Sequence, residues 1–199
     1  DAYDKVYLAE RPELFLKALP GTARGPGQPI GVRADSDWDV PEPELAVVAD
    51  RRGRVVGYAI GDDVSSRSIE GENPLYLPQA KLYRGSCGLG PCLVPVAEAP
   101  EPQDMEIALA IERDGAELFS DRCSVADMKR GLGELVDWLW RGQDLPLGAV
   151  LLTGTSIVPP PGLTLRPGDR VRISITGLGE LTNPVELVDT TGGSAAGAR

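Results

Sequence analysis

Short apolar runs separated by glycine-containing turns dominate the pattern of hydrophobic and polar positions, and they predict a chain built mainly of β-strands. Residues 45–50 and 54–60 are rich in Val, Ile, Ala and Tyr and flank a turn that contains Gly53, which predicts a β-hairpin. A second hairpin is predicted over 106–112 and 116–120. Runs of the same kind predict further strands at 149–153, 170–175 and 184–188.

Helical spacing of apolar residues is clear in one longer segment. Ser124 is a good N-cap, Asp127 three residues later gives a start like a capping box, and Gly142 suits the C-terminal end. Between them apolar residues recur every three or four positions, at Val125, Met128, Leu132, Leu135, Val136 and Leu139. A shorter helix is predicted over 11–19, opened by Pro12. The fold class that follows is α+β and mostly β, with one main helix.

The length of 199 residues is sufficient for one domain with a full core, and no internal repeat is present. Residues 190–199 are rich in Gly, Ala and Ser, so we predict a flexible tail there and the folded domain over 1–189. The first ten residues fit neither a signal peptide nor a basic transit segment, and they read as the middle of a chain that began earlier.

The charge balance limits the partners that we expect. There are 30 acidic and 20 basic residues, a formal net charge of −10, and we find no cluster of Lys and Arg of the kind that a phosphate backbone requires. No apolar run approaches the roughly 20 residues that a membrane-spanning helix needs. We therefore expect neither a nucleic acid nor a membrane as partner.

Cysteine and histidine usage narrows the compartment and the chemistry. Three Cys without a regular disulfide framework predict free thiols in a reducing compartment, and hence a cytoplasmic location. The chain has no His. Within this chain that excludes a Ser-His-Asp triad, a Cys-His pair, His-ligated zinc and imidazole acid–base catalysis.

Three carboxylates are placed to meet at one end of the first predicted hairpin. Glu42 and Glu44 are two residues apart at a strand start, so their side chains share a face and repel unless a cation lies between them. The hairpin returns Asp63 to the same place. Three carboxylates with open positions suit Mg²⁺, Mn²⁺ or Ca²⁺ and not a soft-ligand metal. On spacing alone, a solvated pair of glutamates remains the alternative.

The residues around these carboxylates resemble a known family. Segments 41–48 (PEPELAVV) and 57–67 (GYAIGDDVSSR) are similar to the fumarylacetoacetate hydrolase family. Further matching pieces follow in the family's order, at Lys81, 85–91, 151–155, 165–169 and 177–184. Together the matching pieces span most of residues 3–188.

The resemblance implies a fold, an assembly and a metal. The fold is a highly twisted, mixed β-roll of the fumarylacetoacetate hydrolase type, with residues 1–189 as its C-terminal catalytic domain. The assembly is a homodimer or a higher homo-oligomer. Mg²⁺ is implied on Glu42, Glu44 and Asp63, with Mn²⁺ and Ca²⁺ as other ions that fit. Members of the family also carry an N-terminal segment that this chain lacks.

Within the family, segments 65–81 and 153–159 are most similar to the 2-keto-3-deoxy-D-arabinonate dehydratase branch. This implies a Mg²⁺-dependent hydro-lyase of sugar acid catabolism, which converts a 2-keto-3-deoxy sugar acid to a product such as 2,5-dioxopentanoate through a metal-stabilised enolate. The missing His points the same way. Hydrolase members are expected to activate water with a His–Glu pair, whereas a dehydratase needs no activated water.

Several residues near the matching motifs have candidate roles. Lys81 is either a base or the cation that holds the substrate carboxylate, and Thr155 is implied to line the site with it. Arg67 is a clamp for a carboxylate, or else the ion-pair partner of a nearby Glu. Gln79 is a candidate to bond a substrate hydroxyl, or else makes a structural bond. The candidates for the general acid that protonates the leaving hydroxyl are Glu70 and Glu72.

Two other functions stay open at the level of sequence. One is a Mg²⁺-dependent hydrolase or decarboxylase of an acylpyruvate or oxaloacetate, which needs an acid–base group from outside this chain. The other is a non-catalytic family domain that binds a metal or a partner. The metal-ligand, Lys81 and Thr155 positions are all intact, and this argues against a degenerate domain.

Overall fold

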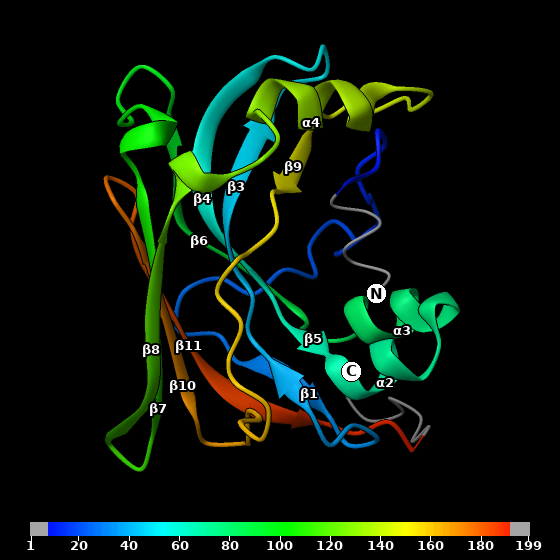
Figure 1. Cartoon of the computed structure of the whole chain (residues 1–199), viewed down its shortest axis with the longest axis vertical. Coiled ribbons are helices and arrows are strands. Elements are labelled where there is room, and N and C mark those ends of the chain that lie inside the picture. Colours follow the sequence, from blue (N-terminus) through cyan, green and yellow to red (C-terminus); the bar gives the residue numbers. More distant parts are fainter. Residues whose placement is uncertain (1–7, 192–199) are drawn as a thin grey trace, which may run out of the picture.

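Two β-sheets and a small two-stranded pair carry the fold in the computed structural model, which describes residues 8–191 (Figure 1). The five-stranded sheet has the order β1-β11-β10-β7-β8 and the four-stranded sheet the order β6-β4-β3-β9, while β2 pairs with β5. The β1–β11 pair is parallel and the other strand pairs are antiparallel, so the β-structure is mixed. The strands are β1 (Ile30–Arg33), β2 (Asp39–Val40), β3 (Pro43–Ala49), β4 (Val55–Asp63), β5 (Ser65–Ser66), β6 (Cys87–Pro95), β7 (Glu106–Arg113), β8 (Ala116–Ser124), β9 (Ala149–Leu152), β10 (Arg170–Ile175) and β11 (Gly179–Val188).

Short helices join these strands. Two of them, with a 3-10 turn between, follow β5 and lie together beside the lower part of the four-stranded sheet in Figure 1. The longest, α4, lies near the upper ends of β3 and β9. The helices and 3-10 turns are α2 (Arg67–Glu72), η1 (Pro74–Tyr76), α3 (Leu77–Lys81), η2 (Pro102–Asp104), η3 (Val125–Asp127) and α4 (Leu132–Trp140).

The core lies between the two sheets, because each contributes one apolar face. In β3, alternate residues such as Leu45 and Val47 belong to the buried cluster, and in β10 Val171 and Ile173 do the same. Each such side chain stabilises the fold by roughly 1.5–3 kcal/mol relative to an exposed position. The alternate residues of β3 that begin with Glu44 point to the other face of the four-stranded sheet. One face of β3 therefore packs in the core, and the opposite face carries the Glu44 carboxylate.

The predicted strands and hairpins are confirmed. The first hairpin is β3 with β4, and the second is β7 with β8. The later predicted strands correspond to β9, β10 and the end of β11. The prediction of a mostly-β domain with few helices is confirmed as well. Pattern alone had not shown the Gly-rich strand β6 or the short strands β1, β2 and β5.

The main predicted helix is shorter than its apolar pattern suggested. Ser124 caps the 3-10 turn η3, where its side chain accepts a hydrogen bond from the amide of Ala126, and α4 begins only after Gly131. Met128 and Gly131 both have extended backbone angles. A glycine in a helix interior costs about 1 kcal/mol relative to alanine, and here the chain breaks at that point.

The predicted helix over 11–19 is wrong, since the structure has neither helix nor strand there. The side chain of Lys17 instead reaches Asp63 on β4, and this tertiary contact outweighs a weak helical preference. Conversely, α2 and α3 were missed because five or six residues are too few to display helical periodicity.

Most of the predicted tail over 190–199 lies outside the described residues, so that prediction and the domain limit at 189 stay predictions. Among residues 8–191 no helix has the length and apolar character required to cross a membrane. In the same range Cys87, Cys92 and Cys123 are free thiols, and Cys87 alone of the three is buried.

Candidate metal centre

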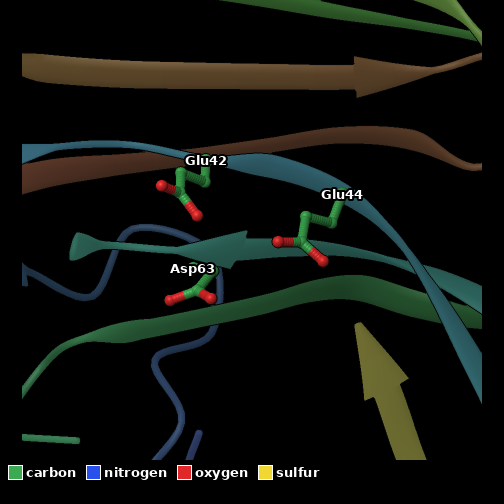
Figure 2. A group of neighbouring side chains, drawn as sticks. All are labelled: Glu42, Glu44 and Asp63. Carbon is green, nitrogen blue, oxygen red and sulfur yellow. The ribbon is translucent and has the colours of Figure 1, made fainter. Parts of the chain in front are cut away.

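Glu42, Glu44 and Asp63 come together as the sequence predicted. One carboxylate oxygen from each lies within 4.8 Å of the others, and all three side chains are buried (Figure 2). The β3–β4 register places Glu44 opposite Gly61, and the amide of Asp63 donates a 2.9 Å hydrogen bond to the carbonyl of Glu42. The site therefore lies on the face of the four-stranded sheet that points away from the core.

Two lysines bring positive charge to this cluster. The Lys81 ammonium donates to Glu42 Oε2 at 2.7 Å and lies 3.4 Å from Asp63 Oδ2. The Lys17 ammonium lies 2.6 Å from Asp63 Oδ1 and donates to the carbonyl of Val64 at 2.8 Å. Burial lowers the pKa of Lys81, but the charges of Glu42 and Asp63 raise it more, so the net direction of its pKa is upward.

Glu44 is the carboxylate with the least compensation. In the described part of the chain it has no ion pair, and its one hydrogen bond comes from the amide of Gly154. Burial, and next the charges of Asp63 and Glu42, raise the pKa of Glu44 well above its usual range. A buried carboxylate in this position lacks a cation, and three carboxylate oxygens are the donors that Mg²⁺ and Ca²⁺ prefer. The residues present therefore fit a hard divalent metal.

Arg67 connects the cluster to α2. Its Nη2 lies 2.7 Å from Glu42 Oε1, and its Nη1 donates to Glu70 Oε2 at 3.1 Å. The N-cap of α2 is Ser66, whose hydroxyl accepts from the amide of Ile69 at 3.3 Å. The structure therefore shows the ion pair of Arg67 with a nearby Glu, which is Glu70, together with a contact to the metal-ligand candidate Glu42.

Glu72 and Gln79 do not join the cluster. Both residues are exposed, and among the described residues neither side chain contacts the three carboxylates. The backbone carbonyl of Gln79 accepts a 3.3 Å hydrogen bond from Arg33. Glu70, with a side chain 9 % exposed, is the better placed of the two proposed acids. The expected roles of Glu72 and Gln79 gain no support from this geometry.

Thr155 lies one residue from the contact with Glu44. Its hydroxyl accepts a 3.1 Å hydrogen bond from the amide of Ile157, so it shapes the loop after β9. Gly154, which has a φ of +90°, presents its amide to Glu44 at the other side of this loop. The loop thus approaches the site through a backbone group, with the Thr155 side chain half-buried beside it.

The segment before β1 supplies residues that sequence reasoning missed. The Lys17 ammonium contacts Asp63, and the Phe15 ring centroid lies 5.7 Å from the Lys81 ammonium. Glu13 lies close enough to Glu70 and Lys81 for their charges to shift its pKa. These three residues are two apart in the chain. Because residues 14–16 are all apolar, the sequence shows no alternation that would have revealed this approach to the site.

Comparisons with known proteins agree with the geometry. Residues 4–186 match the family model for the C-terminal domain of fumarylacetoacetate (FAA) hydrolase. A probable 2-keto-3-deoxyxylonate dehydratase of Haloferax volcanii is 52 % identical over 188 residues, which are 94 % of this chain and 65 % of the relative. A 2-dehydro-3-deoxy-D-arabinonate dehydratase of Saccharolobus solfataricus is 46 % identical over 184 residues, 92 % of this chain and 62 % of the relative. The chain thus spans less than two thirds of the length of these two relatives.

A solved structure extends the similarity to the fold. It is a 2-keto-3-deoxy-D-arabinonate dehydratase complexed with magnesium and 2,5-dioxopentanoate, 45 % identical, with a TM-score of 0.92 over 94 % of this chain and 67 % of that one. A less similar structure, 5-carboxymethyl-2-hydroxymuconate delta-isomerase from Mycobacterium smegmatis, is 34 % identical with a TM-score of 0.72 over 90 % of this chain and 72 % of that one. With its model matched over nearly the whole sequence, this chain belongs to the fumarylacetoacetate hydrolase family.

Proposed function

We propose that this chain is the catalytic part of a Mg²⁺-dependent dehydratase that acts on a 2-keto-3-deoxy sugar acid. One observation carries the proposal: the buried Glu42–Glu44–Asp63 cluster occurs in a chain about half identical to two such dehydratases. The similar solved dehydratase holds magnesium and 2,5-dioxopentanoate, which is the product expected from a 2-keto-3-deoxypentonate. The substrate is therefore a small 2-oxo acid with a hydroxyl at C4.

The proposed ligands of the metal are Glu42, Glu44 and Asp63. Bound Mg²⁺ would supply positive charge next to the carboxylate and the 2-oxo group, and so make the C3 proton more acidic. The chain's own residues would hold the substrate from the other side. Arg67 is placed to orient an anionic group, because its guanidinium already contacts Glu42.

Elimination of water requires a base and an acid. The C3–H bond breaks toward the base, a C3–C4 double bond forms, and the C4 hydroxyl leaves as water with a proton from the acid. Lys81 lies against Glu42 and Asp63, whose charges favour its protonated form, and this geometry suits the cation that holds the 2-oxo acid. Lys81 is also the candidate base, a role for which bound Mg²⁺ would have to offset those charges. Glu70 is the candidate acid. Tautomerisation of the unsaturated product then gives the terminal aldehyde of 2,5-dioxopentanoate.

The direct test is product formation by the full chain. With Mg²⁺ and 2-keto-3-deoxypentonate we expect 2,5-dioxopentanoate, and we expect EDTA or Glu44→Gln to abolish it. Cleavage of an acylpyruvate or decarboxylation of oxaloacetate, with no aldehyde product, would sink the proposal. Exposed Glu117→Gln on β8 is the matched control, and its turnover should equal that of the wild type.

Two variants of Lys81 distinguish its two candidate roles, the base and the cation that holds the 2-oxo acid. Lys81→Arg keeps the positive charge but not a usable base, and Lys81→Met removes both. If Lys81 is the base, Lys81→Arg should retain binding of pyruvate to the Mg²⁺-loaded protein and lose turnover by about 10²–10⁴-fold. Retained turnover in Lys81→Arg would assign Lys81 to substrate binding alone.

We also propose that two copies of the chain associate as a homodimer in the cytoplasm. On the outward face of the four-stranded sheet, Val48 and Val150 are adjacent in the β3–β9 register, and Leu93 lies over Gly57. In a chain of net charge −10, an uncharged surface can meet its own copy without repulsion. Val150→Asp should give a monomer in sedimentation equilibrium, while Leu118→Asp on β8 should not. Free cysteines support the reducing compartment.

A further inference from the structure

The segment over 13–17 places the side chains of Lys17 and Phe15 beside the metal centre. Lys17 contacts Asp63 at 2.6 Å and Val64 at 2.8 Å. The Phe15 ring lies over Lys81, with 5.7 Å between its centroid and the ammonium. Leu14 and Leu16, the neighbours of Phe15 in the chain, are 40 % and 58 % exposed. Through Lys17, Phe15 and Glu13 the segment forms a wall of the site, and these three side chains provide its inward face.

This wall is fixed on the side that precedes it. The Arg130 guanidinium donates to the carbonyl of Glu10 at 3.0 Å and also to the carbonyl of Ala9. The Arg11 guanidinium lies 4.8 Å from the ring centroid of Trp138 on α4. These contacts hold the start of the segment against α4 and the loop before it, far along the sequence from the metal ligands.

The wall is fixed on its other side as well. The amide of Arg24 donates to the carbonyl of Cys87 at 2.8 Å, and Arg24 forms an isolated β-bridge with Gly88 of β6. In Figure 2 the blue ribbon of this part of the chain passes close to Asp63. Anchored at both ends and held by Lys17 in the middle, the segment has little freedom to move away from the carboxylates.

Phe15 is the apolar member of the inward face. Lys17 is committed to Asp63, and Glu13 faces the charges of Glu70 and Lys81. Of these three side chains, Phe15 is the one that can provide dispersion contacts to carbon atoms of a substrate. The ring is 38 % exposed, an area that a bound molecule would cover.

We propose that Phe15 determines specificity for the length of the substrate chain, by packing against the carbons beyond the 2-oxo acid group. This rests on the proposed function, in which the carboxylate and oxo group occupy the metal side of Lys81. The carbons that follow then lie on the side of Lys81 where the Phe15 ring is. A three-carbon 2-oxo acid ends before it reaches the ring, whereas a five-carbon one contacts it.

Isothermal titration of the Mg²⁺-loaded full chain with pyruvate and with 2-oxopentanoate tests the proposal without turnover. Phe15→Ala should weaken 2-oxopentanoate binding about tenfold, since removing contacts to one or two methylene groups costs at least that factor. Pyruvate ends before it reaches the ring, so its binding should change less than about twofold. Phe15→Leu should restore most of the affinity for the longer acid. A melting curve for each variant confirms that it is folded.

Leu16→Ala is the matched control, because Leu16 is the next residue and faces solvent. The proposal is overturned if Phe15→Ala leaves the ratio of the two affinities unchanged, or if Leu16→Ala shifts it equally. Absence of any pyruvate binding by the wild type would overturn it too, since the 2-oxo acid would then not occupy the metal side. If the wild type shows no dehydratase activity but Phe15→Ala changes the affinity ratio as expected, the proposed function is contradicted and this inference is still supported.

Discussion

At the scale of single residues, Asp62 and Asp63 are neighbours on β4 but have different environments and different roles. Asp62 precedes the metal-ligand candidate Asp63 but packs toward Gly88 of β6, and its Oδ1 accepts a 3.1 Å hydrogen bond from the amide of Glu42. It is fully buried, and burial raises the pKa of Asp62 to about 8. Asp62 therefore holds a proton at neutral pH and supports the backbone from which the ligand Glu42 projects.

This burial predicts a pH dependence of stability. The pKa of Asp62 in the folded state lies above its ordinary value of 3.8, so the folded state binds more protons than the unfolded state between about pH 4 and 8. The free energy of unfolding should fall across this window as pH rises, by about 1.4 kcal/mol per pH unit for one proton. Urea unfolding in EDTA from pH 4.5 to 8.5 measures it.

The variant Asp62→Asn cannot titrate and should show a flatter slope in the same experiment. Burial also raises the pKa of Asp39, to about 6, and the pKa of Glu44 well above its usual range, so part of the slope should remain in this variant. The exposed Asp144→Asn serves as control, and it should keep the wild-type slope. An unchanged slope in Asp62→Asn would show that this carboxyl is ionised in the folded protein.

At the same scale, sequence reasoning found the residues that share a strand face and missed those that arrive from elsewhere. Glu42 and Glu44 were predictable because period two is a local property, and Asp63 because a hairpin has a defined return. Lys17 comes to Asp63 across 46 positions of the chain, and no local pattern encodes that approach. Glu72 and Gln79 were assigned because they lie within the matching segment 65–81, and the structure leaves both exposed on α2 and α3.

Among the secondary-structure elements, α2 has the greatest effect on the site for its size. Six residues carry both Arg67 and Glu70, and the helix is held by its cap at Ser66. The Ser66 hydroxyl also donates to the Ser36 hydroxyl at 2.8 Å. Since isolated short helices are unstable, such contacts, more than helix propensity, keep the element folded.

Loss of this cap should therefore affect stability and substrate binding together. Ser66→Ala removes an N-cap and leaves buried partners unsatisfied, at a cost of about 1–2 kcal/mol in the free energy of unfolding. We also expect a raised KM, because Arg67 would lose its fixed position. Urea unfolding and initial rates give the two values. Ser120→Ala, on the exposed strand β8, should change neither, and a stable Ser66→Ala with normal KM would contradict this role.

Predictability also differed from element to element for a physical reason. Both hairpins combine apolar strands with Gly-containing turns, and two agreeing signals outweigh the tertiary surroundings. The segment over 124–142 had the apolar spacing of one helix, but Gly131 divides it into η3 and α4. The segment over 11–19 had only Pro12 and a few leucines in its favour, and long-range contacts determined its path.

The net charge of −10 is a property of the whole molecule with a measurable effect. Acidic side chains repel one another in the folded state, and added salt screens that repulsion over a Debye length of about 10 Å at 0.1 M and 3 Å at 1 M. The melting temperature should therefore rise when NaCl is raised from 0.05 to 1 M. Calorimetry at fixed pH in EDTA is the measurement. A falling melting temperature would show that ion pairs such as Arg113–Asp169 outweigh the repulsion.

Along β3, residues that face the core alternate with residues that face outward, so neighbouring codons of the gene are under two different kinds of selection, one for folding and one for activity. Along 44–49, odd positions face the core and even positions face outward, beginning with Glu44. In a saturation library, changes at Leu45 and Val47 should lower the amount of protein, whereas changes at Glu44 should leave abundance intact and remove activity. New chemistry can therefore be selected on one side of this strand while the information for folding stays on the other.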